Sequence, residues 1–165
     1  MPNYGLLLSG GIDSKVCRHM YPDAQLFHYR TETDLDMSGD SVTVIDIRDD
    51  NDKAEAMTRE TIRLLDDSDL GLDNIIYGFQ LAYDHLSDRD DAPNEGTNDL
   101  VKPLEDMYKH EIIKYASNNN IDLRDTVSCL NELTHEGCGN CYQCLERSHA
   151  LSLLDSEGFD YSNVI

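Results

Sequence analysis

Basic residues are scarce in this chain, and their scarcity excludes several kinds of partner. Among the 165 residues there are 13 Lys and Arg but 33 Asp and Glu, so the formal net charge is −20. A broad surface of this charge repels nucleic acid at long range, so we expect no direct contact with tRNA or DNA. A small nucleotide can still bind, either in a local electropositive pocket or together with Mg²⁺.

Long hydrophobic runs and internal repeats are absent too. No apolar stretch approaches the length of a membrane span, and the first residues contain neither the basic segment nor the apolar run of a secretory leader. We therefore expect a cytoplasmic protein with no membrane partner. A hydrophobic content of 39% over this length suits one compact α/β domain with a small appendage.

A Walker A motif is missing as well, but a different pattern for phosphate binding stands near the start. Residues 4–8 form an apolar run typical of a buried strand, Gly10-Gly11 can form a turn, and Asp13-Ser14 can open a helix. Such a turn leaves backbone N–H groups unpaired at the positive end of a helix, where phosphate binds well. Asp13 is then either a helix cap or a carboxylate that meets the phosphates through Mg²⁺.

The chain after this loop alternates between strand and helix patterns. Strands are expected at 25–29, 42–47 and 74–79, and helices at about 51–67, at about 107–117 and near the C-terminus. This alternation predicts a parallel, doubly wound sheet whose ligands bind beyond the carboxyl ends of the strands. Gly78, at the end of the fourth strand, is expected to let a ligand approach the backbone.

Two segments depart from the regular alternation. Residues 32–40 separate two strands but have no helical face, so we expect one face of the sheet to lack a helix and to need a partner subunit, as in a homodimer or other oligomer. Residues 85–99 are acidic and contain Pro93 and Gly96, which is typical of a flexible loop. This loop is predicted to form a lid over the strand ends.

Four of the five cysteines lie close together near the C-terminus. Cys129, Cys138, Cys141 and Cys144 are separated by eight, two and two residues. In a cytosolic protein this spacing favours a structural Cys₄ zinc site that ties the segment to the last helix, in which Ala150, Leu153 and Leu154 are expected to face inward. An iron–sulfur cluster and free or redox-active thiols remain as alternatives, and Cys17 is predicted to be a buried small residue.

Together these motifs resemble one known family. Ser9-Gly10-Gly11-Ile12-Asp13-Ser14 resembles the loop of the PP-loop ATP pyrophosphatases. The cysteine spacing, with Gly137 and Gly139 around Cys138 and with Arg147 after the last cysteine, resembles 7-cyano-7-deazaguanine synthase. The resemblance implies a Rossmann-like parallel sheet of the PP-loop (HUP) type, with helices on its faces, in a nucleotide-binding domain over residues 1–125. A small Cys₄ zinc-binding segment with the C-terminal helix would follow over residues 126–165.

The function implied by this resemblance is an ATP-dependent C–N ligase. It would convert 7-carboxy-7-deazaguanine and ammonia to 7-cyano-7-deazaguanine through an adenylated carboxylate, with release of AMP and diphosphate or of an ADP-type product, and with ATP, Mg²⁺ and Zn²⁺ bound. The implied catalytic residues are Asp13, Ser14 and Lys109. The implied nucleotide-binding residues are Leu8, Ser9, Gly10, Gly11, Ile12, Asp13, Ser14, His28 and Gly78.

Some family motifs are missing, which leaves the substrate open. The family's Pro-x-Arg-Asn stretch has Thr58-Arg59-Glu60 as its nearest counterpart, and the Tyr-Pro-Asp-Cys segment has only Tyr83, Asp84 and Asp88 nearby. The chain could adenylate a different carboxylate, thiolate tRNA as other PP-loop enzymes do, or be a non-enzymatic nucleotide-binding module held by zinc. Lys109 is alternatively a solvated helix lysine.

Overall fold

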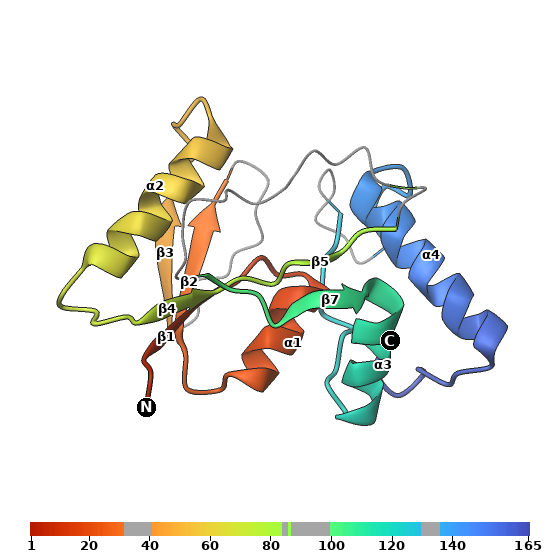
Figure 1. Ribbon diagram of the computed structural model, residues 1–165. Helices are drawn as coiled ribbons and strands as arrows, with labels where there is room; N and C mark the ends of the chain where they lie inside the picture. The colour runs from red at the N-terminus through yellow and green to blue at the C-terminus, as the bar shows by residue number, and fades with distance from the viewer. Residues whose placement is uncertain (32–40, 84–85, 87–99, 130–135) are drawn as a thin grey trace.

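The protein is built around a parallel sheet of five strands in the order β3-β2-β1-β4-β6 (Figure 1). The computed structural model describes residues 1–31, 41–83, 86, 100–129 and 136–165. The strands are β1 (Tyr4–Leu7), β2 (Gln25–Arg30), β3 (Val42–Asp46), β4 (Asn74–Ile76), β5 (Gln80–Leu81), β6 (Leu100–Val101) and β7 (Leu104–Tyr108). The helices are α1 (Ile12–Met20), α2 (Lys53–Asp66), α3 (Lys109–Asn118) and α4 (Tyr142–Glu157). The predicted parallel, helix-covered sheet of the PP-loop type is confirmed.

The strand order creates a crevice at the end of β1. From β1 the chain builds β2 and β3 on one side and then returns to place β4 on the other, with Leu6 opposite Leu26 in β2 and Ile76 in β4. The order therefore reverses between β1 and β4, and ligands of open α/β sheets bind at such a reversal. The loop after β1 and the residues after β4 meet at this point.

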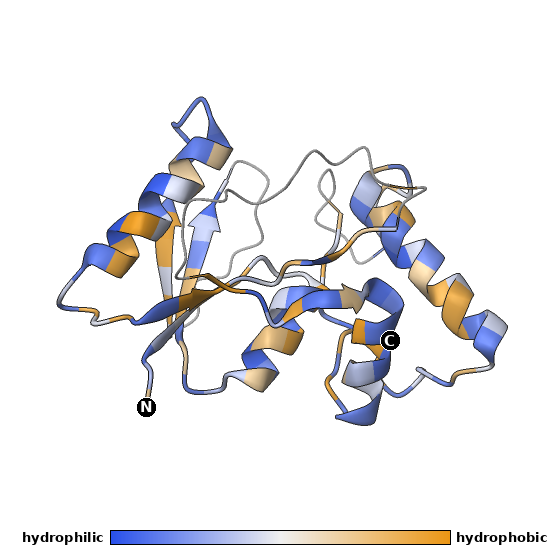
Figure 2. Cartoon of the chain, in the orientation of Figure 1, coloured by the Kyte–Doolittle hydropathy of each residue, from blue (hydrophilic) through white to orange (hydrophobic). Residues whose placement is uncertain are grey.

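Each face of the sheet is covered by helix. Successive residues of a strand point to opposite faces, so Leu26 packs in one core with α1 and α3, while Phe27 packs in a second core with α2. Figure 2 shows apolar residues on the helices and along the central strands. Segment 32–40, on which the prediction of an uncovered face rests, lies outside the described residues.

The chain from β4 to the start of α3 differs from the prediction. β4 ends at Ile76 rather than Phe79, because the chain leaves the main sheet and forms β5, which pairs in parallel with β7. Met107 and Tyr108, expected in a helix, belong to β7, and α3 begins at Lys109 with Glu111 capping the backbone N–H of Tyr108 at 2.8 Å. The predicted lid over 85–99 falls outside the described residues apart from Leu86.

Helix α4 packs in the same core as α1 and α3. Ala150 and Leu154 are buried there, as predicted, whereas Leu153 is only partly buried. On α2, Ala56 is buried and Ala54 is exposed. In the described part of the chain, none of the helices combines the length and apolar character needed to cross a membrane.

Candidate nucleotide site and metal centre

A cavity of about 350 Å³ lies at the carboxyl ends of β1, β2 and β4. Its walls come from the loop after β1, the end of β2, residues 77–80, α2, α3 and α4. Among the residues predicted to bind nucleotide or to act in catalysis, those that line it are Leu8, Ser9, Gly11, Ile12, Asp13, Ser14, His28, Gly78 and Lys109. Gly10 does not line the cavity. The predicted residues thus come together in one place.

The loop itself is shaped by Gly10 and by the Ser14 hydroxyl. Gly10 has φ 79°, a conformation that favours glycine, and α1 then starts at Ile12 with Gly11 as its N-cap. Ser14 Oγ accepts a hydrogen bond from the N–H of Ser9 at 3.2 Å and donates to the carbonyl of Gly11 at 3.1 Å. Asp13 is therefore inside the helix, so its interpretation as the helix cap was wrong.

Two amides of the loop remain available to a ligand. Within the described residues, no acceptor bonds to the N–H groups of Gly10 and Ile12, whereas the N–H of Gly11 makes a long contact with Ser9 Oγ at 3.4 Å. The carbonyl of Gly10 accepts from the N–H of Val127 at 3.0 Å, which holds the loop against the segment that leads to Cys129. Free amides at the positive end of α1 suit an anion such as phosphate.

Lys109 connects the loop to the C-terminal helix. Its Nζ lies 2.7 and 2.6 Å from the two carboxylate oxygens of Asp13 and 3.5 Å from Glu146 Oε2. The Tyr142 hydroxyl donates to Glu146 Oε1 at 2.9 Å. Lys109 is 3% exposed and Glu146 1% exposed, so the alternative of a solvated helix lysine was wrong. One buried ammonium is shared by two carboxylates, and the cluster keeps one net negative charge.

Gly78 and His28 support the loop from either side. A Cβ atom on Gly78 would lie 3.1 Å from Asp13 Cβ and 3.2 Å from Ser14 N, so glycine is needed for close packing against the loop. Gly78 also lines the cavity, and its predicted role in letting a ligand approach the backbone stays a prediction. His28 Nδ1 lies 2.8 Å from the carbonyl oxygen of Leu8, and the buried ring forms part of the cavity wall.

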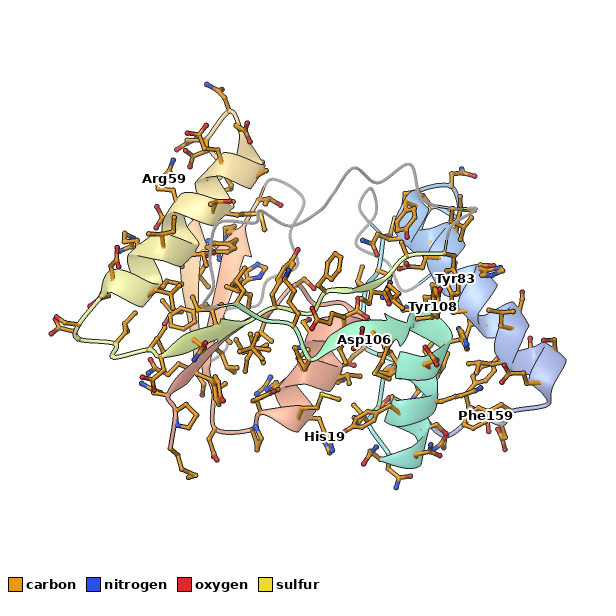
Figure 3. The ribbon with its side chains drawn as sticks, viewed as in Figure 1. His19, Arg59, Tyr83, Asp106, Tyr108 and Phe159 are labelled. Atoms are coloured by element: carbon orange, nitrogen blue, oxygen red, sulfur yellow. The ribbon has the colours of Figure 1, made fainter. Side chains whose placement is uncertain are left out.

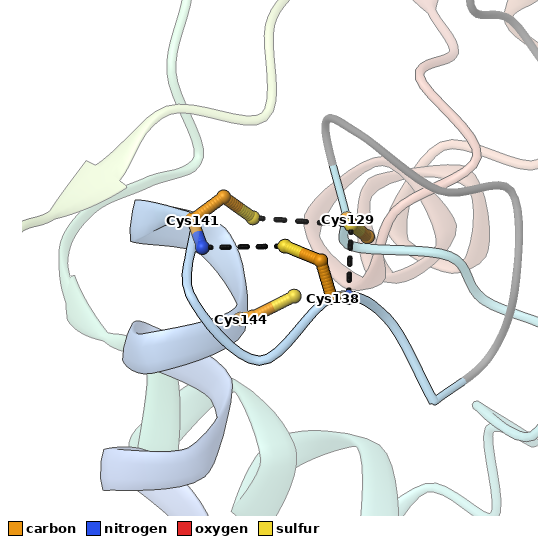
Figure 4. Close-up of side chains that lie close together, drawn as sticks. All are labelled: Cys129, Cys138, Cys141 and Cys144. Atoms are coloured by element: carbon orange, nitrogen blue, oxygen red, sulfur yellow. Dashed lines mark hydrogen bonds between the residues drawn. The ribbon is translucent and has the colours of Figure 1, made fainter.

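The four cysteines form one compact cluster (Figure 4). Their Sγ atoms all lie within 4.8 Å of one another, and those of Cys129 and Cys141 are 4.0 Å apart. A tetrahedral zinc ion with Zn–S bonds of about 2.3 Å places its sulfurs about 3.8 Å apart. Backbone N–H groups of Cys138 and Cys141 donate to the sulfurs of Cys129 and Cys138 at 3.3 and 3.4 Å. Four soft ligands at these distances fit zinc.

Gly137 makes room for this cluster. It has φ 67°, and a Cβ atom there would lie 2.6 Å from Cys144 Sγ. Cys17, the fifth cysteine, is fully buried in α1, and burial, together with the Asp13 charge, raises the pKa of its thiol to about 12. It is therefore a neutral packing residue, as predicted.

Two residues named from the sequence, Tyr83 and Arg59, do not line the cavity. Tyr83 is buried with its ring stacked on Tyr108, at 5.3 Å between centroids, and its hydroxyl accepts from the N–H of His110 at 3.1 Å (Figure 3). Arg59 bonds to Asp50 at 3.1 Å on the exposed side of α2. Neither side chain lines the cavity, so neither replaces the missing family motifs there. Asp84 and Asp88 lie outside the described residues.

Two residues of the cavity wall were missed by reasoning from the sequence. Glu146 precedes Ala150 and Leu154 by four and eight residues, so the inward spacing of α4 already placed it on the buried face. Gln80 lines the cavity from β5, a two-residue strand without a pattern of its own. No sequence signal identified it.

Residues 85–155 match the family model of the queuosine biosynthesis protein QueC. The matched segment contains Lys109, Glu146 and all four clustered cysteines, whereas the loop at residues 9–14 lies before it. No curated protein matches the chain. Over residues 85–155 the chain is therefore QueC-like, which confirms its resemblance to the 7-cyano-7-deazaguanine synthase family.

Proposed function

We propose that this chain is an ATP-dependent C–N ligase that converts 7-carboxy-7-deazaguanine and ammonia to 7-cyano-7-deazaguanine. The QueC match supports a role in queuosine biosynthesis. One observation carries the proposal further: Lys109 of the matched segment contacts both carboxylate oxygens of Asp13, at 2.7 and 2.6 Å, in the N-terminal loop. The two motifs of the resemblance thus meet in one cavity.

The proposed chemistry begins with a poor electrophile. A carboxylate resists attack by ammonia until one of its oxygens becomes part of a good leaving group, and transfer of AMP to that oxygen achieves this. Ammonia then displaces AMP to give the amide. A second ATP activates the amide oxygen, and loss of AMP leaves the nitrile. The protein has to position the reactants and stabilise the charge that develops at phosphorus.

The cavity offers a group for each of these tasks. The amide of Ile12, on the cavity wall, would hold the departing diphosphate, and the Lys109 ammonium would lie beside it. The Asp13 carboxylate would hold Mg²⁺, which supplies further charge neutralisation when bound. The four cysteines would hold Zn²⁺ in a closed, structural site that keeps α4 and Glu146 in place.

The test is turnover with defined reactants. The protein is incubated with ATP, Mg²⁺, ammonium and 7-carboxy-7-deazaguanine, and AMP, diphosphate and the nitrile are measured by chromatography and mass spectrometry. We expect all three products, and no AMP when the carboxylate is omitted. AMP formed only with other carboxylates would assign a different substrate. Absence of ATP binding in calorimetry would favour a non-enzymatic module, and iron with labile sulfide in the purified protein would favour a thiolating enzyme.

A further inference from the structure

Gln80 carries a buried polar atom that the fold leaves unsatisfied. The residue is 6% exposed in β5, and no group of the described residues donates a hydrogen bond to its Oε1. A buried amide oxygen without a donor costs free energy, and most such atoms in folded proteins have a partner. A replacement by leucine would remove this cost.

The position of Gln80 relates this atom to the proposed site. The cavity runs from α2, which contributes Met57, to α4, which contributes Gln143 and Glu146. Figure 1 shows these two helices on opposite sides of the molecule, with β5 leading from the central strands towards α4. We define the α4 arm of the cavity as Phe79, Gln80, Gln143 and Glu146. Asp13 and Lys109 lie beside it through the Lys109–Glu146 contact.

The charge and the hydrogen-bonding groups of the α4 arm determine which kind of ligand group it can bind. The Glu146 carboxylate already faces Lys109 and the Tyr142 hydroxyl, and its charge repels an anionic group nearby. The unused capacity is the acceptor Oε1 of Gln80. A hydrogen-bond donor satisfies it, and a carboxylate or phosphate does not.

We propose that the α4 arm binds a nitrogen-bearing reactant and that Gln80 Oε1 accepts an N–H hydrogen from it. The proposal rests on the proposed function, which supplies two sources of such a group: the ammonia that displaces AMP, and an N–H of the heterocycle that carries the carboxylate. Each offers an N–H hydrogen to an acceptor. Gln80 would then determine specificity for one of the two reactants and would leave ATP binding to the loop.

Steady-state kinetics with Gln80→Leu separate the two sources. We expect KM to rise about tenfold, the size of one lost hydrogen bond, for either ammonium or the carboxylate, with KM for ATP unchanged. The matched control is Gln25→Leu, which removes the same amide from β2, where it donates to the carbonyl of Leu70 at 3.2 Å. Unchanged KM values for both ammonium and the carboxylate in Gln80→Leu would overturn the proposal.

A second measurement needs no turnover. Without ligands, Gln80→Leu should unfold about 2–4 °C above the wild type, because it removes an unsatisfied buried oxygen. A lower unfolding midpoint would mean that the fold itself uses the amide, and would also overturn the proposal. If the wild type forms no AMP with the deazaguanine carboxylate, the proposed function fails, whereas the unfolding midpoint still decides the role of Gln80.

Discussion

At the scale of single residues, the buried Lys109 explains why the loop and the last helix depend on each other. An ammonium that leaves water needs carboxylate partners, and the free energy lost when one partner is removed exceeds the net gain of the pair. Asp13 and Glu146 supply these partners from α1 and α4. Substitutions at either position should therefore affect both stability and activity.

Asp13→Ala is the first such substitution. Its carboxylate contacts the buried Lys109 ammonium at 2.7 and 2.6 Å, so its loss leaves that charge without its nearer partner. We expect diphosphate release to be abolished and the free energy of unfolding to fall by about 1–3 kcal/mol, measured by urea denaturation.

The matched control is Asp125→Ala, which removes an exposed carboxylate that pairs with Lys15. Because both groups of that pair are solvated to some degree, the change in unfolding free energy should stay below about 0.5 kcal/mol. Full turnover in Asp13→Ala would show that the loop is not the phosphate site.

Glu146→Gln tests the second partner of Lys109. The amide keeps an acceptor for the Tyr142 hydroxyl but removes the charge 3.5 Å from Nζ. We expect kcat to fall with little change in KM for ATP, since Asp13 still holds the ammonium, and the free energy of unfolding to change by about 1 kcal/mol. Tyr142→Phe serves as the control, because it removes the hydroxyl that bonds to Glu146 and leaves the charge beside Lys109 Nζ in place. Equal kcat in the wild type and Glu146→Gln would contradict the positioning role.

At the scale of elements, the cysteine cluster lies at the start of α4. Cys141 is its N-cap residue and Cys144 lies in its first turn, while Cys129 comes from the segment that Val127 ties to Gly10. The cluster therefore connects the last helix to the phosphate loop through the backbone. Loss of the cluster should therefore destabilise both α4 and the phosphate loop.

Cys141→Ser should lower zinc content and stability together. Metal is measured by mass spectrometry and unfolding by circular dichroism, and we expect less than one equivalent of zinc and a lower unfolding midpoint. A chelator added to the wild type should lower the midpoint in the same way. Cys17→Ser, outside the cluster, should keep its zinc. A metal-free Cys141→Ser protein with the wild-type midpoint would remove the structural role.

At the scale of the whole molecule, the net charge of −20 opposes compaction. Carboxylates that repel one another across a folded surface are screened by salt, because the Debye length falls from about 10 Å at 0.1 M to about 3 Å at 1 M. We expect the unfolding midpoint to rise between low salt and 1 M NaCl. A midpoint that falls over this range would mean that attractive ion pairs dominate the surface.

The assembly state belongs to this scale too. A homodimer was predicted from segment 32–40 and stays a prediction, as does the division into residues 1–125 and 126–165. Sedimentation measurements on the full chain decide the first. We propose ammonia and a deazaguanine-like carboxylate as the small-molecule partners, with the kinetic experiments above as their test.

The local sequence was sufficient to predict β1, the glycine turn, α1 and the cluster of four cysteines. Residues close together in the sequence determine these features, namely an apolar run, two adjacent glycines and fixed cysteine spacings. Hydrophobic spacing likewise predicted α2 and the inward face of α4. The same spacing contained Glu146, whose charge concealed its burial.

Tertiary structure alone decided the pairing of Lys109 with Asp13, the strands β5, β6 and β7, and the place of Gln80. A two-residue strand has no period to read, and it forms only because a partner strand satisfies its backbone groups. An ion pair between residues 96 positions apart depends on how sheet and helices pack, which no local pattern encodes. The sequence therefore determined which groups this protein has for chemistry, and the fold decided which of them face one another.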